Sequence, residues 1–153
     1  MQTSDPIIKI SVPEQRLDLV DGEEVLASYP VSTSRFGLGS EEGSMKTPLG
    51  KFQIGEKIGG EFAPGTIFRN RVPLALQETV QSTDDLIVSR ILWLEGLEEH
   101  NANTRDRFIY IHGTNHEEEI GKPASHGCIR MKNADLIALF DRIPQGAKVL
   151  IEA

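Results

Sequence analysis

The sequence has no long hydrophobic run, and its acidic residues outnumber its basic ones. None of its apolar segments approaches the ~20 consecutive residues that a membrane-spanning helix needs, so we expect no membrane partner. With 23 Asp and Glu against 16 Lys and Arg, the formal net charge is −7. This balance argues against binding nucleic acid or anionic lipid through a broad basic surface. An anionic substrate would therefore need a local cationic pocket.

Cysteine is almost absent as well. The single cysteine, Cys128, excludes an internal disulfide and is consistent with a reducing compartment. The first residues, MQTSDPIIKISVPEQRLDL, lack the basic start, apolar core and small-residue cleavage site of a secretory signal. The sequence as written therefore predicts a cytoplasmic protein, or a periplasmic or wall-associated one if a signal has been removed.

The length and composition suit one globular domain spanning residues 1–153. A chain of 153 residues with 39% hydrophobic content can bury roughly two thirds of its unfolded surface. Apolar alternation and short apolar runs predict strands at 7–12, 16–20, 24–29, 51–58, 66–69, 86–94, 108–111, 129–131 and 147–151. A helix is predicted at 134–142, with Asn133 as its N-cap and Pro144 beyond its end. These elements indicate a mainly β domain with one or two short helices.

Two segments are left without a predicted helix or strand. Residues 31–50 are rich in glycine and serine, which predicts a long loop that is either functional or mobile. Residues 77–85 are polar and show no clear periodicity.

The reactive side chains are concentrated between Arg107 and Met131. This segment holds three of the four histidines and the only cysteine. Side chains alternate along a strand, so each short apolar run can present reactive groups on one face and a core face on the other. The predicted reactive faces are Phe108, Tyr110 and His112 in the first run, and His126, Cys128 and Arg130 in the second. The segment therefore predicts an active site.

Cysteine nucleophiles need a partner that removes the thiol proton. A free thiol has a pKa near 8.5, and a neighbouring imidazolium can lower it to about 3.5 to 7.5. His112 comes from a separate strand and can approach the sulfur directly, whereas His126, two residues from Cys128, would run parallel to the thiol. We therefore predict Cys128 as nucleophile and His112 as general base, with the Gly113 carbonyl as the acceptor for its second ring nitrogen.

Four neighbours complete the predicted site as oxyanion or substrate-binding residues. Gly127 allows close approach of a substrate, and the backbone N–H groups of Gly127 and Cys128 are candidates to stabilise an oxyanion. Arg130 is predicted to bind a substrate carboxylate, with a pair to a protein carboxylate as the alternative. Ser125 and His126 belong to the same set, and His126 is interpreted as a hydrogen-bonding residue rather than the base.

A metal site is the competing interpretation of the same residues. His112, His116, His126 and Cys128 offer four ligands for zinc. Their spacing resembles no common zinc motif, and the glycine after His112 disfavours the helix that would align His112 with His116. We therefore predict no metal and no other cofactor. His116 and His100 are expected to be solvated loop residues.

The motif around the cysteine resembles the signature of the YkuD-type L,D-transpeptidase catalytic domain. That signature is a histidine followed by Ser/Thr-His-Gly-Cys, a hydrophobic residue and Arg or Asn, and here it corresponds to His112-Gly113 and Ser125-His126-Gly127-Cys128-Ile129-Arg130. The similarity extends to the segment 47–52, TPLGKF, to residues 31–34, and to the last helix and strand. It covers most of the chain.

The resemblance implies a β-sandwich-like fold and cysteine-dependent acyl transfer on peptidoglycan stem tetrapeptides. Cys128 would attack the carbonyl of the third-position L-centre, expel the terminal D-Ala and form a thioester. His112 would be the base, held by the Gly113 carbonyl, while His126 and Arg130 would shape the pocket. No nucleic acid or partner protein is implied.

Two alternatives remain at this point. The same thioester can be resolved by water, which would make the protein an L,D-carboxypeptidase of peptidoglycan recycling, and the missing signal sequence is the reason to consider it. The chain can also be a non-catalytic wall-fragment sensor or a zinc-binding module.

Overall fold

The computed structural model describes residues 5–74 and 85–153. Within these residues there are ten strands, one α-helix and two single-turn 3-10 helices. The strands are β1 (Ile7–Ser11), β2 (Arg16–Asp21), β3 (Glu24–Ser32), β4 (Gly50–Ile58), β5 (Ile67–Arg69), β6 (Val72–Pro73), β7 (Ile87–Gly96), β8 (Tyr110–Gly113), β9 (Ile129–Met131) and β10 (Lys148–Glu152). The helices are η1 (Glu99–Asn101), η2 (Glu117–Glu119) and α1 (Asn133–Arg142).

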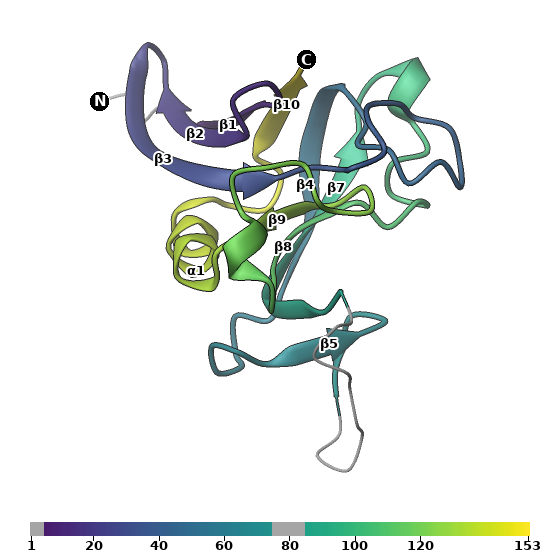
Figure 1. Ribbon diagram of the computed structural model, residues 1–153. Helices are drawn as coiled ribbons and strands as arrows, with labels where there is room; N and C mark the ends of the chain where they lie inside the picture. Colours follow the sequence, from purple (N-terminus) through teal and green to yellow (C-terminus); the bar gives the residue numbers. More distant parts are fainter. Residues whose placement is uncertain (1–4, 75–84) are drawn as a thin grey trace.

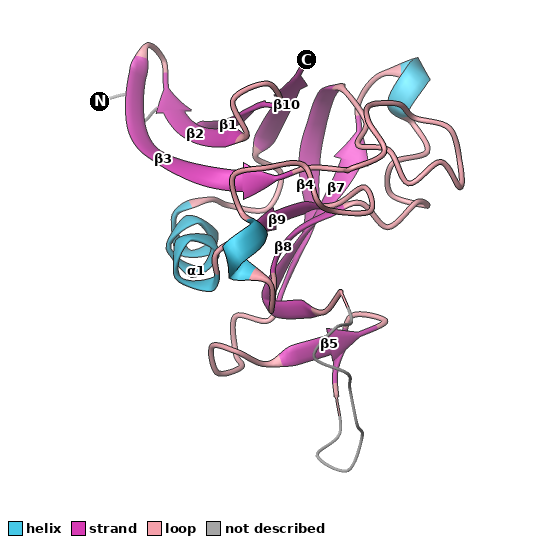
Figure 2. Ribbon diagram, viewed as in Figure 1, coloured by secondary structure: helices cyan, strands magenta, loops and turns pink. Residues whose placement is uncertain are grey.

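All ten strands belong to one sheet that closes on itself (Figures 1 and 2). The strand order is β4-β10-β1-β2-β3-β9-β8-β7-β5-β6, and β4 also pairs with β7, so the sheet from β4 round to β7 forms a closed ring. Most neighbours are antiparallel, while β1–β10 and β8–β9 are parallel. The β5–β6 hairpin projects beyond the ring, at the bottom of Figure 1. The result is the predicted mainly β, sandwich-like fold.

The predicted elements are present, with small shifts at their ends. The hairpin of β2 and β3 forms around the Asp21-Gly22 turn, and β3 runs on to Ser32 before the long loop begins. The strand predicted at 108–111 starts later, at Tyr110, because Phe108 has a φ of 57° and lies outside the sheet. Of the unassigned residues 77–85, only Asp85 lies within the described residues. No helix in the described part of the chain is long and apolar enough to cross a membrane.

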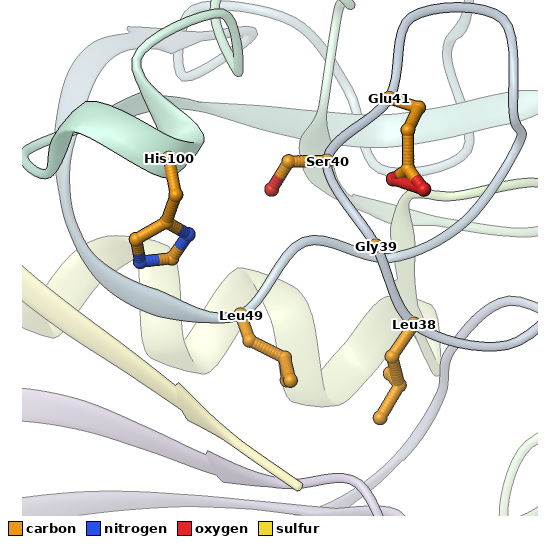
Figure 3. Close-up of a pocket in the computed structure, with 6 residues that line it drawn as sticks. All are labelled: Leu38, Gly39, Ser40, Glu41, Leu49 and His100. Atoms are coloured by element: carbon orange, nitrogen blue, oxygen red, sulfur yellow. The ribbon is translucent and has the colours of Figure 1, made fainter.

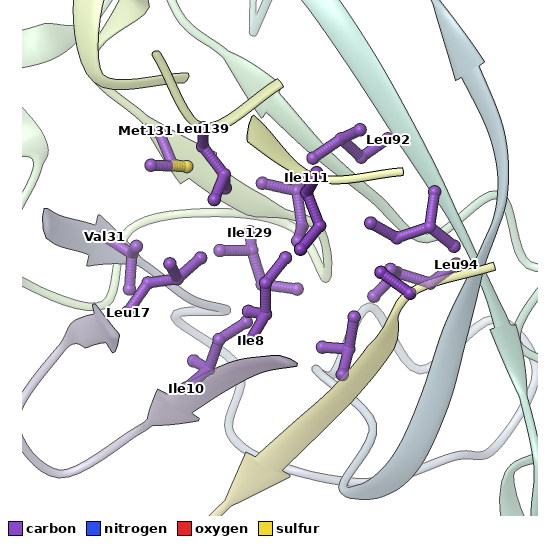
Figure 4. Close-up of a cluster of buried hydrophobic side chains, with 14 of the residues drawn as sticks. Ile8, Ile10, Leu17, Val31, Leu92, Leu94, Ile111, Ile129, Met131 and Leu139 are labelled. Atoms are coloured by element: carbon purple, nitrogen blue, oxygen red, sulfur yellow. The ribbon is translucent and has the colours of Figure 1, made fainter. Parts of the chain in front are cut away.

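The apolar faces of the strands meet inside the ring and form the main core (Figure 4). Alternation along each strand sends every second side chain inward. Ile8, Ile10, Leu17, Ile111 and Ile129 are all fully buried there. Burying one such side chain contributes about 1.5–3 kcal/mol. Because Ile111 and Ile129 point into the core, their sequence neighbours on β8 and at the start of β9 face the other way.

Asn133 ties the start of α1 to the sheet and is not the N-cap, which is Lys132. The Asn133 side chain accepts a hydrogen bond from Ser89 Oγ (2.8 Å) and donates to the Thr114 carbonyl (2.9 Å). The side-chain amide therefore links β7 to the residue after β8 and does not cap the helix to which Asn133 belongs. The prediction of Asn133 as N-cap was wrong because a tertiary contact claims the side chain.

Ser89 lies at an irregularity of β7 opposite the end of β8. The pairing of β7 with β8 shifts between Val88 and Ile91, and Ser89 has a φ of 73°. Bulges of this kind are common beside active sites, where they redirect a strand. Here the bulge lies across from His112 and Gly113, which pair with Ile91 and Val88.

Candidate active site

His112 and Cys128 come from two neighbouring parallel strands. In the pairing of β8 with β9, Ile111 lies opposite Ile129 and His112 lies opposite Arg130. Cys128 directly precedes β9, so its Cα is a diagonal neighbour of the His112 Cα at about 8 Å for ordinary strand spacing. Since the two isoleucines face the core, His112 and Cys128 share the opposite face of the sheet. This agrees with the strand alternation on which the prediction was based, while the catalytic roles of the two residues stay predictions.

The His112 ring is buried and held in one tautomer. Its Nδ1 lies 2.6 Å from the Gly113 carbonyl oxygen. A carbonyl can only accept a hydrogen bond, so the neutral ring carries its proton on Nδ1 and leaves the lone pair of Nε2 available. Burial lowers the pKa of His112 from its ordinary value, against the opposing effects of the Gly113 bond and of Asp85. The imidazole is therefore poised as a neutral base.

Gly113 is required by its surroundings. A Cβ at this position would lie 2.4 Å from the Val88 carbonyl oxygen and 2.2 Å from Asn133 Oδ1. The first neighbour is backbone and cannot move aside cheaply. Glycine therefore allows β8 to approach the β7 bulge and to turn its carbonyl toward His112.

The Cys128 thiol is partly buried and lies between two backbone groups, one just before β8 and one at its first residue. Sγ donates to the Phe108 carbonyl oxygen at 3.3 Å and accepts from the Tyr110 N–H at 3.3 Å. Burial raises the pKa of Cys128 to about 11, partly offset by the Tyr110 N–H. The sequence-based expectation of a lowered thiol pKa was wrong for the unliganded protein. The thiol and the imidazole both rest in their neutral forms, so the proton has to move during attack.

Arg130 is buried and already paired with two carboxylates. Its Nη2 lies 3.0 Å from Asp85 Oδ2 and its Nη1 lies 3.0 Å from Glu119 Oε1. The expectation that Arg130 binds a substrate carboxylate stays a prediction, and against it stand the two protein carboxylates that hold both ends of the guanidinium fork. The alternative, a pair with protein carboxylates, describes what the structure contains.

Asp85 is the member of this network that the sequence did not reveal. Besides Arg130, its carboxylate binds His126 Nδ1 at 3.1 Å. Burial disfavours its ionised form, but the nearby His112, Arg130 and His126 outweigh that effect and lower the pKa of Asp85. Only its position in the sequence could have indicated a role for Asp85. It immediately precedes the strand predicted at 86–94, which pairs with the strand that carries His112.

A small polar cavity of about 180 Å³ lies over this network. It is lined by Arg35, Asp85, His116, Glu119, His126 and Arg130. His116, expected to be solvated, is half-buried at this cavity, whereas His100 is exposed as predicted. His126 is exposed and takes part through its bond to Asp85, in keeping with a hydrogen-bonding residue.

Ser125 and Gly127 shape the backbone that leads into Cys128. Ser125 Oγ donates to the Cys128 carbonyl oxygen at 2.6 Å and accepts from the Gly127 N–H at 3.2 Å. Gly127 has a φ of 124°, a conformation that side-chain-bearing residues rarely adopt. Of the two predicted oxyanion donors, the Gly127 N–H is therefore engaged by Ser125 in the unliganded protein.

The long loop between β3 and β4 is fastened to the same backbone. Thr47 Oγ1 accepts from the Ser34 N–H at 2.9 Å and donates to the Gly127 carbonyl oxygen at 2.9 Å. Arg107 Nη2 donates to the Lys46 carbonyl oxygen at 2.7 Å. The loop thus supports the turn that presents Cys128.

A second cavity, of about 520 Å³, is formed by this loop away from the thiol (Figure 3). Its lining residues are Leu38, Gly39, Ser40, Glu41, Leu49 and His100. It contains neither the nucleophile nor the base. The chemistry therefore points to the smaller region around Cys128, despite the greater volume here.

The proposed zinc set is not assembled. Among residues 5–74 and 85–153, no group of three His, Cys, Asp or Glu side chains is placed to hold a metal ion. His112 and Cys128 instead use backbone partners, and His126 uses Asp85.

Comparison with known proteins gives a consistent picture. The family model of the YkuD-type L,D-transpeptidase catalytic domain matches residues 5–151. YkuD of Bacillus subtilis, provisionally named an L,D-transpeptidase, is 28% identical over 144 residues, covering 94% of this chain and 64% of its own length. YqjB of the same organism, also provisionally named an L,D-transpeptidase, is 54% identical over 52 residues, covering 33% of this chain and 30% of its own length. The chain thus spans less than two thirds of these relatives.

A solved structure shows the same fold. L,D-transpeptidase 3 from Mycobacterium tuberculosis, in complex with a faropenem-derived adduct, superimposes with a TM-score of 0.62 at 13% sequence identity. The alignment covers 98% of this chain and 61% of that protein. At this identity the match supports the fold alone.

Proposed function

This chain belongs to the family of L,D-transpeptidase catalytic domains, and on that premise we propose that it transfers the acyl part of a peptidoglycan stem tetrapeptide through a thioester on Cys128. The bond cleaved joins the L-centre of the third residue to the terminal D-Ala. The observation that carries this proposal is the 2.6 Å contact between His112 Nδ1 and the Gly113 carbonyl. This contact leaves Nε2 of His112 free to accept the thiol proton. His112 lies on β8, the neighbour of the strand that Cys128 precedes.

The first half of the reaction forms the thioester. As Sγ attacks the scissile carbonyl carbon, the S–C bond forms and the thiol proton moves to His112 Nε2. The tetrahedral intermediate then collapses, the C–N bond breaks, and the departing D-Ala nitrogen takes the proton back from His112. Because Cys128 and His112 rest neutral, this route needs no preformed ion pair.

The surrounding groups support the charges that appear on the way. The Tyr110 N–H, 3.3 Å from Sγ, stabilises developing negative charge on the sulfur. Asp85 favours the protonated form of His112. The amides of Cys128 and Gly127 remain the proposed oxyanion donors, and the Gly127 N–H has to release Ser125 Oγ to act.

The thioester can then react with an amine or with water. An amine acceptor gives a cross-linked peptide and makes the protein a transpeptidase, whereas water gives a tripeptide and makes it an L,D-carboxypeptidase. Both outcomes return the Cys128 thiol.

Mass spectrometry of the intact protein after incubation with a tetrapeptide tests the proposal. We expect a mass gain equal to the tripeptide acyl group on the wild type, and none on Cys128→Ala. Because the relative from Mycobacterium tuberculosis carries a faropenem-derived adduct, faropenem serves as a second acylating probe. Analysis of the released peptide, with and without an added amine, then separates transfer from hydrolysis.

Two histidine substitutions, one inside the site and one outside it, test whether His112 is the base. His112→Ala should lose acylation, whereas His100→Ala, which changes an exposed histidine outside the site, should retain it. Acylation that persists in Cys128→Ala, or an unmodified wild type with both probes, would overturn the proposal.

A further inference from the structure

A stacked guanidinium, that of Arg71, lies against aromatic residues that neighbour Cys128. The Arg71 guanidinium carbon is 4.9 Å from the centre of the Trp93 ring and 5.0 Å from the centre of the Phe108 ring. Its Nη1 donates to Tyr110 Oη at 3.0 Å. Among the described residues, aromatic faces and one hydroxyl therefore hold the cation.

Two of the three residues that hold this cation also contact Cys128. Phe108 supplies the carbonyl that accepts from Sγ, and Tyr110 supplies the N–H that donates to it. The guanidinium and the thiol thus share two immediate neighbours. No carboxylate within residues 5–74 and 85–153 pairs with Arg71, in contrast to Arg130, which holds two.

The backbone at this place is strained in a way that favours glycine. Asn70 and Arg71, the two residues between β5 and β6, have φ values of 51° and 66°, and Phe108 has a φ of 57°. A two-residue hairpin turn with both central residues at positive φ is normally Asn-Gly. Arginine in the glycine position costs stability, and strain of this kind concentrates at functional sites.

We propose that Arg71 binds the terminal carboxylate of the donor peptide, a role that rests on the proposed acyl transfer at Cys128. The carboxylate of the leaving residue lies one residue beyond the scissile carbonyl, about 3.8 Å along the chain. The Arg71 guanidinium shares Phe108 and Tyr110 with the nucleophile and pairs with no carboxylate of residues 5–74 and 85–153, and it matches the substrate carboxylate in charge and in planar geometry. The site therefore selects peptides in which a free carboxylate follows directly after the bond that is cut, and it takes over the role that sequence reasoning gave to Arg130.

Two tetrapeptides that differ only at the C-terminus, carboxylate against primary amide, test this assignment. We expect wild-type kcat/KM for acylation of Cys128 to favour the carboxylate by about 10- to 100-fold, the range for a hydrogen bond between charged groups. Arg71→Gly should remove this preference by slowing the carboxylate peptide alone, and Arg71→Lys should retain part of it. Because glycine suits the turn, Arg71→Gly is expected to fold at least as well as the wild type.

Two control variants separate binding from packing. Asn70→Gly alters the same turn and keeps the guanidinium, so the preference should persist. Arg105 lies over the same Trp93 ring at 4.1 Å but is paired with Glu56 and Glu95, so Arg105→Gln should leave the preference intact. Equal rates for the two peptides in the wild type, or an unchanged preference in Arg71→Gly, would overturn the assignment.

Binding without reaction gives an independent measurement. Trp93 is the only tryptophan of the chain, so its fluorescence reports peptide binding at the stack in the Cys128→Ala protein. A tighter Kd for the carboxylate peptide that is lost with Arg71→Gly supports the carboxylate site even if the wild type is never acylated, in which case only the proposed function fails. Equal Kd values for the two peptides would count against the site even if acylation is normal.

Discussion

Replacing Asp85 by Asn removes one of the two carboxylates that neutralise the buried Arg130. The substitution keeps the shape of the side chain and takes away its charge. Arg130 has a side-chain exposure of 2%, whereas Asp85 is 30% exposed. Removing one partner from a fully buried ion pair costs about 3–5 kcal/mol. Because Glu119 still holds the other end of the fork and Asp85 is partly solvated, we expect a loss of about 1–3 kcal/mol.

The pH dependence of this loss follows from the lowered pKa of Asp85. A carboxyl whose folded pKa lies below its unfolded value, near 3.9, stabilises the protein above that value. The contribution is lost as the pH falls through the folded pKa. The wild type and Asp85→Asn should therefore differ most at pH 7 and converge as the pH falls below the lowered pKa of Asp85.

Urea denaturation at a series of pH values, from pH 7 down to the most acidic value at which the wild type is still folded, measures the difference. A loss of 2 kcal/mol corresponds to a thermal midpoint lower by about 4–8 °C in a domain of this size. Glu14→Gln breaks an exposed pair with Arg16 and should change stability by less than about 0.5 kcal/mol. If Asp85→Asn matches this control at pH 7, or loses the same free energy at every pH of the series, the network does not stabilise the buried Arg130 as described.

Three further outcomes are expected. Alkylation of Cys128 by iodoacetamide should be slow at pH 7 and rise about tenfold per pH unit toward a midpoint near pH 11, since burial raises the pKa of its thiol to about 11; a plateau below pH 8 would contradict this. Gly113→Ala should cost at least about 2 kcal/mol in thermal unfolding and abolish acylation, because its Cβ would lie 2.4 Å from the Val88 carbonyl; a folded and active variant would show that β8 can move. Ile111→Ala should lower the free energy of unfolding by about 2–5 kcal/mol, because this side chain is fully buried; a loss below 1 kcal/mol would mean that the core collapses around it.

Local sequence patterns were sufficient for most of the fold and for the reactive pair. Strand alternation placed Ile111 and Ile129 in the core, and this fixed the common face of His112 and Cys128. The Gly113 carbonyl was predictable as the partner of His112 because no Asp or Asn lay at a suitable offset.

The features that sequence reasoning missed all depend on distant parts of the chain. Asp85 lies far from Arg130 in sequence and in a segment without periodicity, so nothing local signalled the pair. The raised pKa of the Cys128 thiol comes from burial, which the motif does not reveal. Asn133 is a residue type that often caps helices, but its side-chain oxygen instead accepts a hydrogen bond from Ser89 of β7.

The parallel pairing of β8 with β9 has a consequence for the spacing between histidine and cysteine. Parallel neighbours need a return path of about a dozen residues or more, because the chain must travel back before it can run in the same direction again. Residues 114–128 form this return connection. The number of residues between His112 and Cys128 is therefore determined by the length of the connection between two parallel strands and not by the reaction. A change that slips β9 by one residue would, by contrast, point the Cys128 side chain toward the hydrophobic core.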